Sequence, residues 1–338
     1  MPYIQDVLSE SYGDILDTSN ISSSFPWLFE KSQNCILSPD SDGLLCGLFM
    51  SNILKWQISG FYDGKVLVCD QNVPVEDCIF LDVDIFRPTI RSVGHHMVLY
   101  NKNEIPNNWD NYRNCLQLNN LRRYDCLHDF RIKYPLATIH FLLATVGTTL
   151  RINLKPNSIC PLLFTDGTFN ILFKYPENVL NWLTFLQTNL HENTLNSIFD
   201  NNNYTIIQII RLMDDFFRQR DTISIPNERG DRLRISTTEG LPFNLPPHGN
   251  TYSLELGARE RIIRFLNLIG NLTGWIYDNN FWCWEDYDLI QFTKSNFESD
   301  GLRLNGGNFT NLMQRNPFSW AITSRNNLEY TIDQNGVF

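Results

Sequence analysis

The chain has 338 residues, of which 43% are hydrophobic and 13% aromatic, so it holds enough apolar material for one large or two ordinary domains. Its formal net charge of −10 argues against a broad basic surface for duplex nucleic acid, although a local basic patch stays compatible with that charge. The eight cysteines form no C-x-x-C pair, which argues against a zinc ribbon. Cys35, Cys69 and Cys78 lie inside apolar runs, which favours buried free thiols in a reducing compartment.

The N-terminal segment has no feature of a targeting sequence. Residues 1–33 predict a helical extension, because apolar side chains recur there at helical spacing: Ile4, Val7, Leu8 and Tyr12. The segment has neither a basic n-region nor an apolar h-region, and the longest apolar run, Ile139 to Val146, is too short to cross a bilayer. We therefore expect a cytoplasmic protein with no membrane partner.

Residues 34–190 alternate short apolar runs with helical patterns. Strand-like runs are found at 35–37, 65–69, 78–81, 89–93 and 159–164, and helical patterns at 44–54, 135–145 and 176–190. This alternation predicts an α/β fold with a doubly wound, mainly parallel sheet. In such a sheet the carboxyl ends of the strands share one edge, where open α/β sheets bind their ligands.

The remaining residues predict two further parts. Residues 191–250 read as a helical and irregular connector, with one helix at 204–218 followed by a Pro- and Gly-rich stretch. Residues 251–338 predict a C-terminal α+β module that begins with an amphipathic helix at 258–273. The aromatic cluster at 275–287 is interpreted either as a small core or as a platform on which bases of single-stranded nucleic acid stack.

Acidic and histidine side chains follow the predicted strands. Asp40 and Asp42 lie in a tight turn after the first strand, where an isolated D-x-D-G is best read as a helix N-cap and otherwise as a cation site. Three later strand ends carry similar groups, D-V-D at 82–84, G-H-H at 94–96 and T-D-G at 165–167. Because these ends are expected at one edge of the sheet, they favour the cation site over the cap.

In this order the four motifs resemble those of the DHH phosphoesterase superfamily, which includes RecJ-type exonucleases and oligonucleotide phosphodiesterases. The resemblance covers roughly residues 34–185 and implies a DHH-like domain that binds one or two Mn²⁺ or Mg²⁺ ions. The metal ligands that it implies are Asp40, Asp42, Asp82, Asp84, His95 and Asp166. It also implies that His95 and His96 are catalytic, because they would stabilise the phosphoryl oxygens or act on the leaving group.

Two positions depart from the family pattern. Gly94 stands where the family has the aspartate of Asp-His-His, and Ser38 stands where RecJ-like members have an additional aspartate. Asp82 is the candidate to compensate for Gly94, because residues two apart on a strand point to the same face. Loss of one or two ligands would reduce a dinuclear site to one metal ion or to none.

Several further residues are candidates for substrate contacts. Arginine is frequent between residues 211 and 264 and is the preferred fork for phosphate, which points to Arg229, Arg232 and Arg234. His128 is a fourth candidate to orient substrate, although a histidine beside an aspartate is also typical of a solvated loop. His140 lies inside an apolar helical pattern and is interpreted as a core histidine.

The resemblance implies metal-dependent hydrolysis of a phosphodiester bond, in short or single-stranded nucleic acid or in a nucleotide, by an activated water. The alternative is a catalytically degenerate DHH-like protein that binds nucleotide or nucleic acid, or serves as a subunit of a homo-oligomer or larger complex. Gly94 is the position that separates these two hypotheses. An unrelated Rossmann-like enzyme lacks support, because the chain has no G-x-G-x-x-G stretch.

Overall fold

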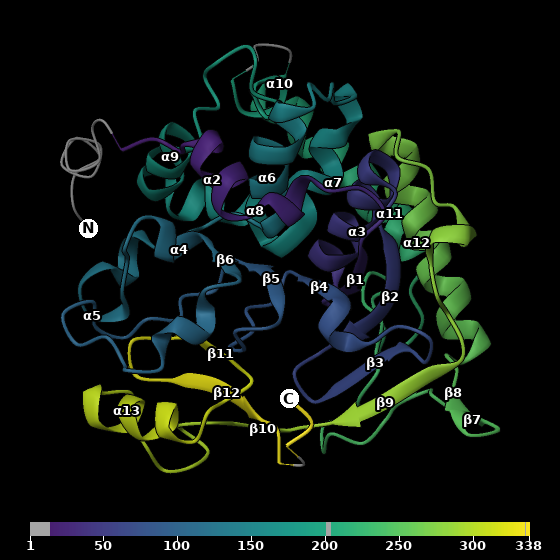
Figure 1. Ribbon diagram of the computed structural model, residues 1–338. Coiled ribbons are helices and arrows are strands. Elements are labelled where there is room, and N and C mark those ends of the chain that lie inside the picture. Colours follow the sequence, from purple (N-terminus) through teal and green to yellow (C-terminus); the bar gives the residue numbers. More distant parts are fainter. Residues whose placement is uncertain (1–13, 201–203, 335) are drawn as a thin grey trace.

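The computed structural model of the protein describes residues 14–200, 204–334 and 336–338 (Figure 1). The helical pattern expected around Ile4 to Tyr12 lies outside these residues. The described α-helices are α2 (Thr18–Ser24), α3 (Ser41–Leu54), α4 (Leu118–Leu121), α5 (Cys126–Asp129), α6 (Thr138–Leu142), α7 (Ile159–Phe164), α8 (Thr168–Lys174), α9 (Pro176–Phe185), α10 (Asn196–Phe199), α11 (Ile206–Asp221), α12 (Leu256–Thr273) and α13 (Gly306–Gln314). A π-helical turn, Leu143–Gly147, continues α6.

The described strands form two sheets. They are β1 (Asn34–Leu37), β2 (Gln57–Tyr62), β3 (Val66–Asp70), β4 (Cys78–Leu81), β5 (Arg91–Gly94), β6 (Cys115–Gln117), β7 (Pro247–His248), β8 (Thr251–Tyr252), β9 (Tyr287–Gln291), β10 (Thr293–Asn296), β11 (Ser319–Ile322) and β12 (Leu328–Ile332). In the described part of the chain, the large sheet has nine strands in the order β6-β5-β4-β1-β2-β3-β9-β8-β7, and the small sheet has the order β10-β12-β11.

The large sheet is mixed. Strands β6, β5, β4, β1 and β2 pair in parallel, which confirms the expected α/β class and places their carboxyl ends at one edge. From β2 onward the pairings are antiparallel, through β3, β9, β8 and β7. Strand β2 has no counterpart among the predicted strands. Strand β9, from the C-terminal module, therefore extends the same sheet that residues 34–117 begin.

The two faces of the sheet are covered differently. Cys35 and Leu37 of β1 pack into a core with α3, α6, α7 and α12, while Ile36, between them, points to the opposite face. That opposite face packs on Phe292 and Phe318 from the segments beside β10 and β11. Figure 1 shows these helices on one side of the strands, with β10–β12 and α13 on the other. The expected doubly wound arrangement, with helices on both faces, is thus not confirmed.

The strand predicted at 159–164 is wrong, because Ile159–Phe164 is the helix α7. A six-residue apolar run has no periodicity that distinguishes a buried strand from a buried helix. Pro161 carried the missing signal, since proline is excluded from central strands but tolerated in the first turn of a helix. After α7, a 3₁₀ turn with Asp166 in the left-handed region (φ 50°) leads into α8.

The aromatic cluster at 275–287 is part of the main core. The side chains of Trp275, Trp282 and Trp284 are buried, and Tyr287 is fully buried. With so little ring face accessible to a base, the core interpretation is favoured over the stacking platform. All eight cysteines are free thiols, and seven of them are buried, as expected. Among the described helices, none is both long and apolar enough to cross a bilayer.

His140 of α6 is a core histidine, as interpreted from the sequence. Its side chain is fully buried, and its Nδ1 accepts a hydrogen bond from the Ala137 N–H at 3.1 Å. Burial lowers the pKa of His140 to about 4. The folded protein therefore disfavours the imidazolium form, whereas the unfolded chain protonates this residue near its ordinary pKa of about 6.5.

Acidification is therefore expected to destabilise the fold through His140. Between about pH 6.5 and pH 4, His140 is protonated in the unfolded chain but neutral in the native state. The free energy of unfolding therefore decreases as the pH falls through this range. Between pH 7 and 5 this loss amounts to about 2 kcal/mol. Urea unfolding of His140→Asn, whose amide oxygen can accept the Ala137 N–H, should show a correspondingly flatter pH dependence. Equal slopes for wild type and variant would contradict this assignment.

Candidate metal centre

A cavity of about 840 Å³ opens at the carboxyl ends of β1, β4 and β5. Its other wall is formed by the small sheet, through residues of β11 and β12. The sequence-predicted residues among those that line the cavity are Asp40, Asp82, Asp84, His95, His96, Asp166 and Arg232. The parallel strands thus bring together side chains from three of the motifs, as expected, and the 3₁₀ turn after α7 adds Asp166 from the fourth.

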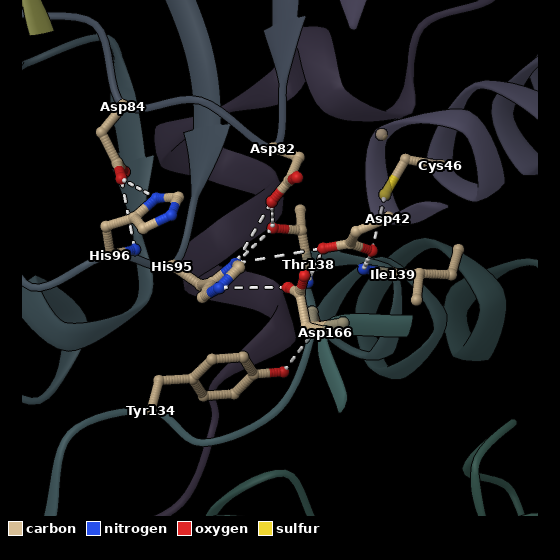
Figure 2. Close-up of polar contacts among 12 residues, drawn as sticks. Asp42, Cys46, Asp82, Asp84, His95, His96, Tyr134, Thr138, Ile139 and Asp166 are labelled. Carbon is tan, nitrogen blue, oxygen red and sulfur yellow. Dashed lines mark hydrogen bonds and ion pairs between the residues drawn. The ribbon is translucent and has the colours of Figure 1, made fainter. Parts of the chain in front are cut away.

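Four of these motif residues converge closely. Asp42, Asp82, His95 and Asp166 each offer one ligand atom within 4.8 Å of the others. Figure 2 shows the His95 ring between two carboxylates, with Nδ1 3.3 Å from Asp82 Oδ1 and Nε2 3.3 Å from Asp166 Oδ2. Three carboxylates and an imidazole form a donor set that hard and borderline divalent cations use. This cluster could hold a metal ion.

Asp42 is held by the first turn of α6. It is fully buried in α3, and its oxygens accept hydrogen bonds from the backbone N–H groups of Thr138 (2.6 Å) and Ile139 (3.1 Å). The thiol of Cys46, one turn further along α3, lies 3.6 Å away. These backbone N–H groups have no partner within their own helix, so a carboxylate suits this position. Asp42 is therefore fixed by two helices before any ligand binds.

Thr138 is a site residue that the sequence did not reveal. Its hydroxyl donates to Asp82 Oδ1 at 2.8 Å and lies 2.8 Å from His95 Nδ1. Because the hydroxyl proton is used on Asp82, His95 Nδ1 is the donor to Thr138 and its proton resides there. The Nε2 lone pair then faces Asp166, which is the orientation of a metal-binding imidazole. One sequence signal was available. Ala137, the N-cap residue of α6, has no side chain that could accept from the first N–H groups of the helix, so these groups need an acceptor from elsewhere in the protein.

The cluster concentrates negative charge in a poorly solvated place. Burial raises the pKa of Asp42 well above its usual range, and the charges of Asp82 and Asp166 raise it further. Burial likewise raises the pKa of Asp82, with the charges of Asp40 and Asp166 adding to the effect. A carboxylate that is buried beside others favours either protonation or a cation. The residues present therefore fit a divalent ion, which would offset this repulsion.

Asp84 belongs to a separate pair. One of its oxygens accepts hydrogen bonds from the His96 N–H (3.2 Å) and from His96 Nδ1 (3.1 Å), while its other oxygen contacts the Cys115 thiol at 3.8 Å. The expectation that Asp82 and Asp84 share one face is wrong. Both lie after β4, and Asp82 adopts a left-handed conformation (φ 63°), so the strict alternation of a strand does not apply. Figure 2 shows the Asp84 carboxylate at the His96 ring and the Asp82 carboxylate at His95 and Thr138.

The Asp84 carboxylate also accounts for Gly94. A Cβ atom on Gly94 would lie only 2.3 Å from Asp84 Oδ1, so any side chain there would collide with that carboxylate. Position 94 is therefore glycine because Asp84 fills the space beside it. Asp82, which was the candidate to compensate for Gly94, instead contacts His95.

Asp40 acts as a helix cap. It is the N-cap of α3, where its Oδ1 accepts a hydrogen bond from the Gly43 N–H at 3.3 Å. It lines the cavity but lies outside the group of four, so both original interpretations of the acidic turn hold in part: Asp40 caps the helix and Asp42 enters the cluster.

Replacing Asp40 is accordingly expected to affect stability more than metal binding. Asp40→Ala should lower the free energy of unfolding by about 1 kcal/mol, the usual cost of losing an N-cap. Isothermal titration with Mn²⁺ should show an affinity within about three-fold of wild type, whereas Asp82→Asn should show none. Asp40→Ser, which keeps a capping oxygen, serves as the control and should restore most of the stability. A loss of Mn²⁺ affinity in Asp40→Ala that matches Asp82→Asn would make Asp40 a ligand.

Of the three arginines predicted to bind substrate, one lines the cavity and two do not. Arg232 lines the cavity, and the neighbouring Leu233 N–H donates to Pro39 O at 2.8 Å, which fixes this segment beside the acidic turn. Arg229 pairs instead with Asp231 at 2.6 Å, and Arg234 donates to the Asn227 carbonyl.

His128 is part of a local helix cap. Its Nδ1 lies 2.8 Å from Asp125, the N-cap residue of α5, and this side chain is not among the described residues that line the cavity. Three cavity cations were missed by sequence reasoning, namely Arg131, Lys133 and Lys294. Lys133 is half-buried over the Phe130 ring, at 4.5 Å, and burial lowers its pKa.

Comparison with family models, with curated proteins and with solved structures finds no match to this chain. Membership of the DHH superfamily therefore stays a prediction from the four motifs. The chemistry of the site rests on its own geometry, which is three carboxylates and one oriented imidazole at the base of a cavity with basic side chains.

Proposed function

We propose that the protein is a hydrolase that cleaves a phosphoester bond with the help of a divalent cation such as Mn²⁺ or Mg²⁺. The observation that carries this proposal is the convergence of Asp42, Asp82, His95 and Asp166 on one point of the cavity. The cation in this cluster would supply electrophilic catalysis, by polarising a phosphoryl oxygen and making water more acidic.

Three basic side chains at the cavity support a phosphoryl substrate. Arg131, Lys133 and Arg232 line it, and within the described residues none of the three forms an ion pair. These cations are available for the non-bridging oxygens of a phosphate, which carboxylates alone would repel. A volume of about 840 Å³ accommodates a nucleotide or a short oligonucleotide end.

His96 has a distinct role in this proposal. Its side chain is 43% exposed at the cavity while Asp84, which binds its Nδ1, is almost fully buried. The buried carboxylate fixes the ring so that Nε2 is directed to the substrate, as an aspartate orients an imidazole in hydrolytic sites. His96 would then donate a hydrogen bond to a phosphoryl oxygen or a proton to the leaving oxygen.

The test is a hydrolysis assay with Mn²⁺ on bis-p-nitrophenyl phosphate and on labelled short single-stranded oligonucleotides. We expect turnover by wild type and its loss, by at least 10³-fold, in Asp82→Asn plus Asp166→Asn. Asp288→Asn, an exposed residue of β9 in the same sheet, is the matched control and should retain full activity. Hydrolysis that is absent in wild type, or equal in the double variant, would refute the proposal.

A second candidate function is binding of a nucleotide without turnover. The observation that favours it is the His95 ring, whose two nitrogens each lie 3.3 Å from a carboxylate and which, as imidazolium, would bridge Asp82 and Asp166 without a metal. Equilibrium dialysis with labelled nucleotide in the presence of EDTA distinguishes the two. Binding that persists without metal, together with no hydrolysis when Mn²⁺ is added, would favour the binding protein.

A further inference from the structure

A second cavity, of about 350 Å³, lies at the opposite end of the sheet from the metal centre. Asn34 and Gln57, the first residues of β1 and β2, line it at the amino ends of these strands. Asp70, the last residue of the antiparallel strand β3, reaches the same end. The sheet itself thus separates this cavity from the carboxylate cluster, and nothing in the proposed hydrolysis uses it.

The wall of this cavity contains a buried polar group without a partner. Trp282 is 4% exposed, and its indole N–H forms no hydrogen bond with any described residue. The indole of Trp284 stacks on it, at 5.6 Å between ring centroids, yet donates normally to the Tyr277 hydroxyl at 2.9 Å. Leaving a buried donor unpaired costs about 1–3 kcal/mol, and the residue that carries this donor forms part of the cavity wall.

Other groups around the cavity also have unused hydrogen-bonding capacity. The Gln57 side-chain amide has no hydrogen bond to another described residue, and the Asn34 amide uses only its oxygen, which accepts from Ser59 at 3.2 Å. The Arg259 guanidinium has one long contact, 3.4 Å to Asn279. These amides and the guanidinium present both donors and acceptors in one small space, which suits a ligand that carries both.

The charge of the lining selects against anions. Three carboxylates, of Asp70, Glu285 and Asp286, contribute to it against one cation, Arg259. A free phosphate would therefore be repelled by this lining. The two tryptophans present almost no accessible ring surface, since Trp284 is only 2% exposed, so a flat base would find no face on which to stack.

We propose that this second cavity binds a neutral, polyhydroxylated molecule of monosaccharide size. Hydroxyl groups are donors and acceptors at once, so they can accept from the Gln57 amide and from Arg259 while donating to Asp70. The indole of Trp282 in the cavity wall would report this binding. The site excludes phosphorylated sugars through its carboxylates. This binding is independent of the proposed hydrolysis and would persist if no metal bound.

The test follows the indole N–H signals of the full-length, ¹⁵N-labelled protein by NMR. The chain has eight tryptophans, and the Trp282 signal is identified by its absence in Trp282→Phe. D-glucose, D-ribose and myo-inositol are each added up to 50 mM. We expect a saturable shift of the Trp282 signal with at least one of them, and at least a five-fold weaker affinity in Gln57→Ala plus Arg259→Met. Gln219→Ala, on the surface of α11, is the control and should bind as wild type does.

Each remaining outcome contradicts the proposal. If none of the three polyols shifts the Trp282 signal while the other indole signals show a folded protein, the cavity is not a polyol site. A saturable shift with adenine but with no polyol would assign the cavity to a nucleobase edge instead. A shift with inorganic phosphate alone would show that the carboxylates do not exclude anions.

Discussion

Asp82→Asn is expected to make the metal-free protein more stable and, at the same time, to abolish its stabilisation by Mn²⁺. Asp82 is buried beside Asp42 and Asp166, and in the absence of a cation its burial, together with the charges of Asp40 and Asp166, raises its pKa and disfavours its charge. The amide removes the charge but keeps an oxygen that can accept from Thr138, as Asp82 Oδ1 does. Relief of such strain at a binding site is worth about 1 kcal/mol.

The measurement is thermal unfolding in EDTA and in increasing Mn²⁺. In EDTA, the variant should unfold about 1–2 °C above wild type. With Mn²⁺ at about 100 times its Kd, wild type should gain about 2.7 kcal/mol, because the ion binds the folded state only. The order of stability of the two proteins should therefore invert between the two conditions, which is difficult to explain unless Asp82 is a ligand.

Asp288→Asn is the matched control for this prediction, since it removes an exposed carboxylate from the same sheet and should respond to Mn²⁺ as wild type does. A wild-type melting curve that Mn²⁺ leaves unchanged would contradict the metal centre. A variant that still gains stability with Mn²⁺ would remove Asp82 from it.

The second large effect is expected at Gly94. Gly94→Ala should destabilise the protein by about 3 kcal/mol and abolish the activity proposed for the site, although alanine adds one methyl group. That methyl carbon would lie 2.3 Å from Asp84 Oδ1, and the nearby backbone of β5 is held in the sheet by β4 and β6. Overpacking of this kind costs about 1–3 kcal/mol, and displacement of the buried carboxylate from His96 adds the loss of charge-assisted hydrogen bonds.

A double-mutant cycle with Asp84→Ala isolates this contact. Removing the carboxylate makes room for the methyl group, so Gly94→Ala plus Asp84→Ala should be more stable than Gly94→Ala alone, with a coupling of about 1–3 kcal/mol. Activity should stay low in the double variant, because nothing then orients His96. Additive free energies of unfolding in urea would show that Asp84 and Gly94 do not compete for this space.

A second substitution at position 94 tests the same contact between Gly94 and Asp84. Gly94→Asp would recreate the Asp-His-His pattern of the DHH superfamily, yet here it is expected to impair folding because Asp84 already occupies that space. Asp84 follows β4, the strand next to β5, and its carboxylate fills the space beside Gly94 while it binds His96.

The sequence by itself determined the α/β class, the helix α3 and the strand-end position of three of the four motifs. The apolar run of β1, the helical spacing after Gly43 and the acidic turn at Asp40 are local features, because neighbouring residues produce them. The shared edge of parallel strands accounts for the meeting of Asp42, Asp82 and His95, whereas Asp166 reaches them from the 3₁₀ turn after the helix α7.

Only the tertiary structure decided which partner each acidic side chain of the site binds. Asp82 has a left-handed backbone and contacts Thr138 and His95, whereas Asp84 binds His96, and no residue pattern announces that conformation. The hydrogen bonds from Thr138 to Asp82 and from its N–H to Asp42 join residues 56 and 96 positions apart. Such contacts depend on how helices and strands pack, and packing is not encoded in any short stretch of sequence. For the same reason an apolar run such as Ile159–Phe164 became a helix only in the context of the core that surrounds it.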